Sequence, residues 1–312
     1  MTRRPNEISG LLFLVGMPRS GTKLLRDLIN QSNSIYMPPV EAKWIPTIVE
    51  LFGDGAAIIK QKQISHINCI IQQSAYAQNM KELRLGVPLI PNNLAGITLL
   101  EVVRWFLHSS MGKNENVTNV IVGDKTPVNI FKLDFLKRLD PNALVLHIVR
   151  DPRDQSRSVA KTWGKSPIRN ASRWSHGVGL AEKWGANNPS QYFRIRYEDL
   201  ISDTRRTMLS VCDFLQIPFT EDVVKLKKPS ENLGDAKGET AIVHSNTGKW
   251  REYFSKKEIK KIEELTAPTA RLVGYKMKTA NQRQLSTVEE MWYTLLDGFH
   301  MLKFYSGEYG LL

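Results

Sequence analysis

The residues with the strongest potential for chemistry stand at positions 16–24, which read GMPRSGTKL. Gly16 and Gly21 have the spacing of a phosphate-binding loop, G-x-x-x-x-G-K-[ST], but Thr22 precedes Lys23 where that signature has the lysine first. Successive backbone N–H groups that lead into a helix form a cradle for anions, which hydroxyl groups can extend. The segment therefore predicts a phosphate site.

The same loop contains Arg19 and Ser20, and its surroundings favour side-chain cations over a metal. Enzymes that act on nucleoside triphosphates hold magnesium with a Ser/Thr after the loop lysine and with an acid at the end of a nearby strand. Here Thr22 precedes the lysine, and the apolar run LVLHIV ends at Arg150. We expect no metal ligands in this site, and phosphate charge neutralised by side chains.

Apolar runs of strand length alternate with helical patterns along the chain. This alternation predicts an α/β fold, a P-loop-like three-layer sandwich with a central parallel sheet, in which ligands bind beyond the carboxyl ends of the strands. The predicted strands are 10–15, 35–37, 120–122, 144–149 and 192–197, and the predicted helices include 23–30, 198–217, 256–265 and 287–304. We expect one domain over 1–312, with a helical excursion from the sheet at 42–118, a flexible loop at 225–240 and a C-terminal helix within 284–305.

Composition limits the class of protein. The formal net charge of +12 in 312 residues suits a polyanionic partner, namely nucleic acid, a membrane surface or an anionic substrate. Only two cysteines occur, Cys69 and Cys212, without the spacing of a disulfide framework or a zinc site. The sequence shows no secretory cleavage pattern and no apolar run of membrane-spanning length, so we expect a soluble, cytoplasmic protein without a membrane span.

Four segments in order carry a resemblance to a known family: GMPRSGTKLL, IVRDPRDQSRSVA, RYEDL and TGKW. Together they resemble the sulfotransferases that use 3′-phosphoadenosine-5′-phosphosulfate (PAPS), which are similar to P-loop kinases in fold and need no metal. The resemblance implies that the first loop binds the 5′-phosphosulfate and that Arg150 and Ser158 bind the 3′-phosphate. It also implies nucleotide contacts from Tyr197 and from the late loop formed by Thr247, Gly248, Lys249 and Trp250.

Two further segments are similar to the protein-tyrosine sulfotransferase-like branch, which also has PRSGT in its loop. MPPVEAKWIP resembles the segment with a catalytic glutamate, which makes Glu41 the base, and GDKTP resembles a strand end with a functional lysine, Lys125. The histidine base of the cytosolic small-molecule enzymes has no counterpart in KTP. Where the tyrosine-directed enzymes have a serine before Lys-Trp, this chain has Gly248, with Ser245 or Thr247 as stand-ins.

The implied reaction is in-line sulfuryl transfer to an acceptor hydroxyl, on a peptide tyrosine, a glycan, a lipid or a small molecule. The helical region 42–118 would then shape the acceptor pocket. Arg19 and Lys125 would hold the leaving phosphate, and Glu41 would accept the proton, its pKa raised by apolar neighbours such as Trp44. A structural alternative is that Glu41 caps a helix or pairs with Lys43. His147 is expected in the core.

Two rival functions remain open at this level. One is a nucleotide-dependent kinase, which magnesium-dependent turnover of ATP would support. The other is a polyanion-binding protein whose nucleotide loop is vestigial, which binding to heparin without nucleotide binding would support. If the protein is a sulfotransferase, we expect no nucleic-acid partner. The acceptor and the oligomeric state are not assigned.

Overall fold

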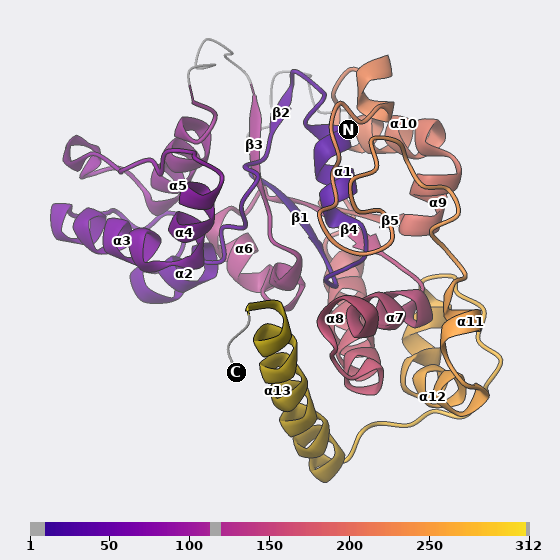
Figure 1. Ribbon diagram of the computed structural model, residues 1–312. Coiled ribbons are helices and arrows are strands. Elements are labelled where there is room, and N and C mark those ends of the chain that lie inside the picture. Colours follow the sequence, from indigo (N-terminus) through magenta and orange to yellow (C-terminus); the bar gives the residue numbers. More distant parts are fainter. Residues whose placement is uncertain (1–9, 113–119, 310–312) are drawn as a thin grey trace.

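A five-stranded parallel sheet forms the centre of the molecule, with the strand order β2-β3-β1-β4-β5 (Figure 1). This computed structural model describes residues 10–112 and 120–309, the side chains of 300–309 excepted. The strands are β1 (Leu12–Gly16), β2 (Ile35–Tyr36), β3 (Ile121–Lys125), β4 (Leu144–Val149) and β5 (Tyr192–Arg196). The predicted central parallel sheet is confirmed.

The apolar run that predicts β1 is buried on both faces of the sheet. Leu11, Phe13 and Val15 belong to one hydrophobic core and Leu12 and Leu14 to the other. Alternate side chains of a strand point to opposite faces, so a run without polar residues is what a central strand requires. Each fully buried side chain of this size contributes about 1.5–3 kcal/mol through the hydrophobic effect.

Helices cover both faces of the sheet and complete the three layers. The core with Leu12 and Leu14 is closed by α1 (Thr22–Ile29), α9 (Tyr197–Ser202) and α10 (Thr204–Leu215), near which η3 (Glu221–Val224) lies. The opposite core is closed by α6 (Leu133–Leu139) and α8 (Pro167–Asn187). Next to α8 pack η2 (Pro127–Phe131), α7 (Pro152–Trp163) and α12 (Lys256–Leu272), and α11 (Trp250–Tyr253) packs on α7.

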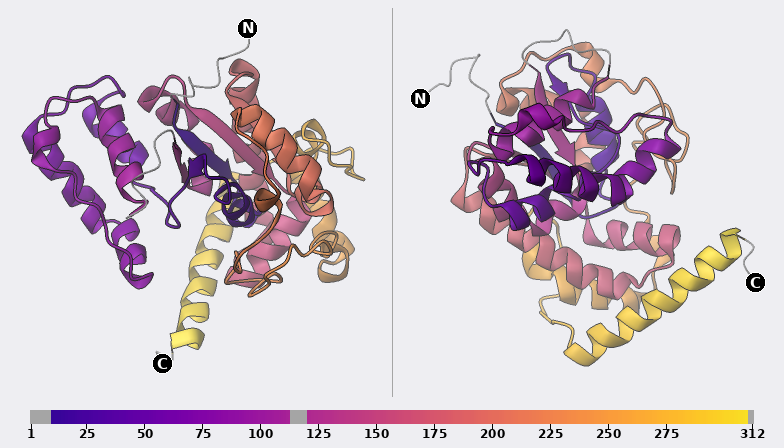
Figure 2. Two further views of the ribbon diagram at one scale, coloured as in Figure 1. Left: turned by 90° about the horizontal axis from the view of Figure 1, so that it is seen from above. Right: turned by 90° about the vertical axis from the view of Figure 1, so that its left-hand side faces the viewer.

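A group of helices between β2 and β3 extends from the sheet (Figure 2). It comprises α2 (Ile45–Phe52), α3 (Gln61–Gln73), α4 (Ala75–Glu82), η1 (Asn92–Leu94) and α5 (Leu99–Ser109). Trp44 meets the ring of Phe106 edge-on at 4.9 Å, and these helices share one hydrophobic core with the sheet. They correspond to the predicted helical region 42–118, of which 113–118 lies outside the described residues.

Several predicted boundaries differ from the structure. The helix predicted over 198–217 is two helices, because Asp203 interrupts it and its side chain accepts the N–H of Arg206 to cap α10. The helix predicted over 256–265 continues to Leu272 although Pro268 lies inside it. The helices α7 and α8 had not been delimited from sequence. The last helix, α13, spans Thr287–Tyr309, longer than predicted.

Two other expectations concern the loop at 225–240 and membrane-spanning helices. Residues 225–240 contain no helix, and a single bridge pairs Glu231 with Lys237. The mobility predicted for this loop stays a prediction. Within the described residues, no helix combines the length and the apolar character that crossing a membrane requires.

Candidate functional site

The loop after β1 forms a tight turn that leads into α1. The backbone N–H of Ser20 donates to the carbonyl of Met17 at 3.2 Å, and Gly21 has φ = 94° at the start of the helix. A Cβ at Gly21 would lie 2.4 Å from the ring of Tyr197, so only glycine fits this position. The hydroxyl of Ser20 is buried and has no hydrogen-bond partner within the described part of the chain, which leaves it available to an anion.

Arg19 adopts a backbone conformation that is rare for a residue with a side chain. Its φ is 70°, a conformation that costs about 1–3 kcal/mol and is found most often at functional sites. Its guanidinium donates to the Ser158 hydroxyl at 3.2 Å, to Glu231 at 3.2 Å and to the carbonyl of Leu233 at 2.9 Å. Lys23, one turn further on, donates to the side chain of Asn232 at 2.8 Å.

Arg150 follows β4 and brings the end of that strand to the same loop. Its guanidinium donates to the backbone carbonyl of Arg19 at 3.2 Å and to that of Asn246 at 2.8 Å. It also lies over the ring of Tyr197, 4.3 Å from the ring centroid. The Tyr197 hydroxyl accepts from the Asn246 amide at 2.9 Å, and burial raises the pKa of this tyrosine. Arg19, Arg150, Ser158 and Tyr197 are thus brought together as the sequence predicts.

These side chains line one small cavity, which the segment 226–246 covers. Its volume is about 40 Å³, a little more than the share of one water molecule in the liquid. Sites for small molecules typically measure about 300–1,000 Å³. In this structure, the cavity is thus smaller than a typical nucleotide site.

Two cations of α7 had not been identified from sequence: Arg157, which lines this cavity, and Lys161 next to it. Arg157 and Lys161 lie on α7 and hold the carboxylate of Asp235 at 2.6 and 2.7 Å, and Lys249 of the late loop approaches it to 3.4 Å. Their spacing offered a signal, because Arg153, Arg157 and Lys161 follow one another at intervals of four on a helix.

The late loop approaches the cavity through Lys249 and Asn246 rather than through a hydroxyl. Thr247 and Ser245, the suggested stand-ins for a serine, are both exposed. Asn246 is buried and contacts both Arg150 and Tyr197, a role that sequence reasoning had missed. Gly248 and Trp250 donate backbone N–H groups to Asp154, and the Trp250 side chain is buried.

Glu41 and Lys125 meet at the end of the neighbouring strand. The carboxylate accepts from Lys125 at 3.0 Å and from Lys43 at 3.2 Å. Lys125 ends β3 with its side chain 1% exposed. Burial raises the pKa of Glu41, but the two ammonium groups outweigh it and hold that pKa below its usual value. The expectation that Trp44 and other apolar neighbours raise this pKa is therefore wrong, because the cations dominate.

The pKa of Lys125 is lowered as well, but by burial and not by its partner. The attraction of Glu41 offsets this effect of burial only in part. The pairing of the strands places Lys125 and the end of β4 on either side of the loop. Leu14 of β1 is paired with Lys125 of β3, and Gly16 of β1 with Ile148 of β4. Lys125 thus lies at one side of the loop and Arg150 at the other, along the carboxyl edge of the sheet.

Asp124 holds the Glu41 segment to this strand, which sequence reasoning had also missed. Its side chain is 1% exposed and accepts the backbone N–H of Ala42 at 2.9 Å. Burial raises its pKa to about 6. His147 is fully buried, as predicted, with its ring against the hydroxyl of Tyr192.

Within residues 10–112 and 120–309, no three His, Cys, Asp or Glu side chains are grouped so that they could hold a metal ion. The cavity contains cations and hydroxyls, and the carboxylates that line it, Glu231, Asp235 and Glu239, all belong to the segment 226–246. Cations and hydroxyls bind anions with several charges, and an acid–lysine pair at the next strand end can accept and stabilise a proton.

Comparison with known proteins agrees with this arrangement. A sequence profile described as the sulfotransferase family matches residues 12–221, which include all five strands. An uncharacterized protein of Aquifex aeolicus is 22% identical over 255 residues, 78% of this chain and 30% of that protein. A putative protein-tyrosine sulfotransferase of Caenorhabditis elegans is 24% identical over 170 residues, 49% of this chain and 64% of its own length.

The fold has solved counterparts as well. The sulfotransferase domain of the olefin synthase of Synechococcus PCC 7002 superimposes with a TM-score of 0.59 at 20% identity, over 86% of this chain and 96% of that domain. The chain spans less than two thirds of the length of the curated relatives it matches. Because the family profile covers more than half of the chain and its whole sheet, the protein belongs to the sulfotransferase family.

Proposed function

We propose that the protein transfers the sulfuryl group of PAPS to an acceptor hydroxyl. The observation that carries this proposal is the meeting of Arg19, Arg150, Ser158 and Tyr197 in one cavity beside the loop, with Lys125 and Glu41 at the next strand end. The donor has two phosphorylated ends: the loop with Arg19 would hold the 5′-phosphosulfate, and Arg150 and Ser158 would hold the 3′-phosphate. Arg157, Lys161 and Lys249 are further cations beside this cavity.

The proposed reaction is a single displacement at sulfur. The acceptor oxygen forms a bond to sulfur while the bond between sulfur and the bridging oxygen of the 5′-phosphate breaks. The acceptor proton passes to Glu41, and the products are a sulfate ester and 3′-phosphoadenosine 5′-phosphate (PAP). Positioning and charge stabilisation supply most of the rate in transfers of this type.

Each side chain has a part in this scheme. Glu41 is ionised at neutral pH because its pKa is held down by Lys125 and Lys43, so it is ready to accept a proton. Lys125 is released from Glu41 when that proton arrives, and its ammonium is then available to the leaving phosphate. Arg19, Ser20 and the N–H groups at the start of α1 hold the phosphosulfate.

The acceptor would approach Glu41 from the side of the helices between β2 and β3. Trp44, three residues after Glu41, joins those helices through its contacts with Tyr76 and Phe106. A peptide, glycan, lipid or small molecule with a hydroxyl is compatible with this proposal.

The direct test is transfer from ³⁵S-labelled PAPS in the presence of a chelator, against a panel of peptide, sugar, steroid and phenolic acceptors. We expect a labelled ester with at least one class and none with Arg19→Ala. Magnesium-dependent turnover of ATP in place of sulfuryl transfer would contradict the proposal and favour a kinase.

A further inference from the structure

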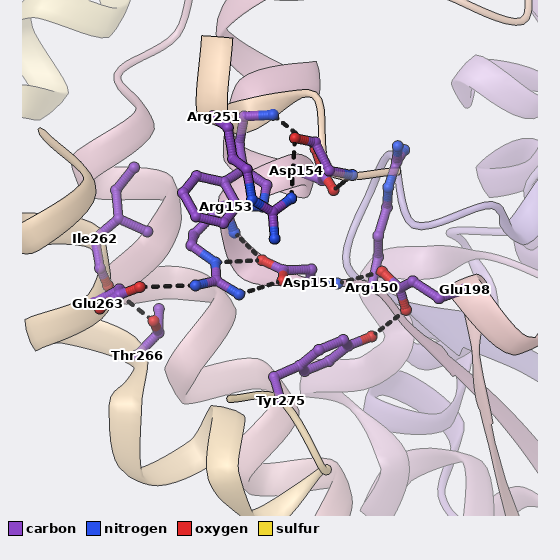
Figure 3. A network of polar contacts seen from close by, with 12 residues as sticks. Arg150, Asp151, Arg153, Asp154, Glu198, Arg251, Ile262, Glu263, Thr266 and Tyr275 are labelled. Atoms are coloured by element: carbon purple, nitrogen blue, oxygen red, sulfur yellow. Dashed lines mark hydrogen bonds and ion pairs between the residues drawn. The ribbon is translucent and has the colours of Figure 1, made fainter. Parts of the chain in front are cut away.

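The carboxylate of Asp154 holds the late loop at two points (Figure 3). One of its oxygens accepts the backbone N–H of Gly248 at 2.5 Å and the other that of Trp250 at 3.0 Å. Asp154 is 2% exposed and lies in the first turn of α7, so the loop is attached to the helix that also carries Ser158 and Arg157. The residue between the two held amides is Lys249.

Ion pairs of Arg153 lie next to this attachment. Asp151 caps α7 through the N–H of Arg153 and binds its guanidinium with both carboxylate oxygens, at 2.9 and 2.6 Å. Glu263 of α12 accepts from the same guanidinium at 2.7 Å (Figure 3). The guanidinium also lies 4.2 Å from the ring centroid of Trp250, which fixes that ring from below the loop.

Packing alone does not account for a carboxylate at this place. A buried ionised group is costly unless hydrogen bonds satisfy it, and burial raises the pKa of Asp154 despite the nearby Arg150 and the two amides. An apolar side chain would avoid this cost but would leave the N–H groups of Gly248 and Trp250 without an acceptor. What the carboxylate adds is a pair of acceptors that fixes both peptide groups around Lys249.

The fixed peptides direct Lys249 toward the cavity. Gly248 has φ = 74°, a conformation that turns the chain before Lys249. The ammonium of Lys249 then reaches Asp235, the same carboxylate that Arg157 binds. Lys249 has a long, flexible side chain, so its contribution to binding depends on how well its backbone is held.

We propose that Asp154 is a positioning residue for donor binding, which acts by holding Gly248 and Trp250 so that Lys249 faces the anionic donor. This inference rests on the proposed function, since it requires that Lys249 contacts the donor. Asp154 does not touch the reacting atoms in this scheme, and its effect appears in donor affinity rather than in the rate of the chemical step.

The test is a double-mutant cycle on the full chain, with PAP as the probe. Binding is measured by calorimetry for the wild type, Asp154→Asn, Lys249→Ala and the double variant. In Asp154→Asn the amide can accept only one of the two N–H groups, and we expect its Kd to rise about tenfold. If Asp154 acts through Lys249, the double variant binds no more weakly than Lys249→Ala alone.

Steady-state kinetics supply the second readout. For Asp154→Asn we expect a KM for PAPS about tenfold higher and a kcat within about threefold of the wild type. If the two losses in affinity multiply in the double variant, or if kcat falls as much as affinity, Asp154 has a merely structural role and the inference is overturned. If Asp154→Asn does not fold, Asp154→Ser, with its single acceptor, takes its place in the same cycle.

This experiment distinguishes a failure of the proposed function from a failure of the positioning role of Asp154. A folded wild type that does not bind PAP contradicts the proposed function. A wild type that binds PAP, combined with an Asp154 effect independent of Lys249, contradicts only the positioning role.

Discussion

At the scale of single residues, the pair of Glu41 and Lys125 joins groups that are 84 positions apart in the chain. The pair contains a partly exposed acid and a deeply buried base. Breaking it by removing the acid leaves Lys125 buried without its main partner, whereas removing the exposed Lys43 takes away only a surface contact.

We predict that Glu41→Gln lowers kcat by about 10²–10⁴-fold and changes the Kd for PAP by less than about threefold. The amide has nearly the same shape but cannot accept a proton from the acceptor. The measurement is single-turnover sulfuryl transfer together with PAP calorimetry. Lys43→Ala is the matched control and should alter both quantities little. Turnover at the wild-type rate in Glu41→Gln would remove Glu41 from the mechanism.

Asp124 leads to a prediction about pH. Burial raises its pKa to about 6 in the folded protein, against 3.8 for the free side chain. Lys125 and Glu41 are the charged side chains that also affect this pKa. A carboxyl whose pKa is raised by folding contributes most below the unfolded pKa, and that contribution is lost as pH rises through 6. The shift of about two units corresponds to roughly 3 kcal/mol.

We therefore expect Asp124→Asn to gain stability relative to the wild type as pH rises from 4 to 8, by up to about 3 kcal/mol. The asparagine oxygen can still accept the N–H of Ala42, so the fold should be retained. Urea unfolding at several pH values measures this difference. A difference in free energy of unfolding that stays constant over this range would show that Asp124 does not titrate there.

At the scale of elements, the segment 226–246 competes with any ligand of the cavity. Glu231 holds Arg19, Asp235 holds Arg157 and Lys161, and Asn246 holds Arg150. Contacts with these cations lower the pKa of Asp235, so it is ionised throughout the physiological range. A donor phosphate must displace these acceptors before it can reach the cations.

We predict that Asp235→Asn lowers the Kd for PAP by about three- to tenfold, because the neutral amide holds the three cations less strongly than a carboxylate does. Calorimetry at low and at moderate salt measures the effect, which should shrink as salt rises. Glu239→Gln is the control for net charge, since Glu239 belongs to the same segment but has no ion pair among the contacts of the described residues. Weaker binding by Asp235→Asn would mean that Asp235 orders the site for the donor.

An element can be predicted from sequence when residues within its own segment determine where it forms, and not when contacts with distant residues do. β4 occupies the six residues of the run LVLHIV, because a strand buried on both faces needs a mostly apolar segment, which only His147 interrupts here. The break at Asp203 was missed because helical spacing continues across it while the capping side chain decides the boundary. The parts of the site that follow from a loop packing on distant elements, such as Asn246 on Tyr197, leave no local pattern.

The residues of the site also fall into two groups, those that the sheet positions and those that contacts between loops position. Arg19 and Arg150 follow the ends of β1 and β4, so a parallel sheet brings them to one edge whatever the loops do, and Ser158 lies in the second turn of the helix after β4. Lys249 and Asp235 reach that edge only because Asp154 and the cations of α7 hold their segments. Physical reasoning from sequence thus reaches Arg19 and Arg150, the family resemblance adds Ser158 and Lys249, and both miss Asp154 and Asp235, which fix the loops.

At the scale of the whole molecule, the proposed donor site joins β1, β3, β4, α7 and the late loop, and ligand binding should therefore stabilise the entire fold. A ligand at one hundred times its Kd adds about 2.7 kcal/mol to the free energy of unfolding. For a chain of this size we expect PAP to raise the Tm by about 4 °C, without magnesium. The net charge of +12 gives polyanions a second, nonspecific way to bind, so controls decide the meaning of the shift.

The controls vary the phosphate groups of the ligand and the cation of the protein. Adenosine 5′-phosphosulfate, which has no 3′-phosphate, should produce a smaller shift than PAP at equal concentration. Arg150→Ala should lose most of the PAP shift, because Arg150 joins the loop, Tyr197 and Asn246. Heparin should still bind that variant through its remaining surface charge. A PAP shift that survives in Arg150→Ala, or that heparin reproduces in full, would indicate that the positive surface and not the cavity binds the nucleotide.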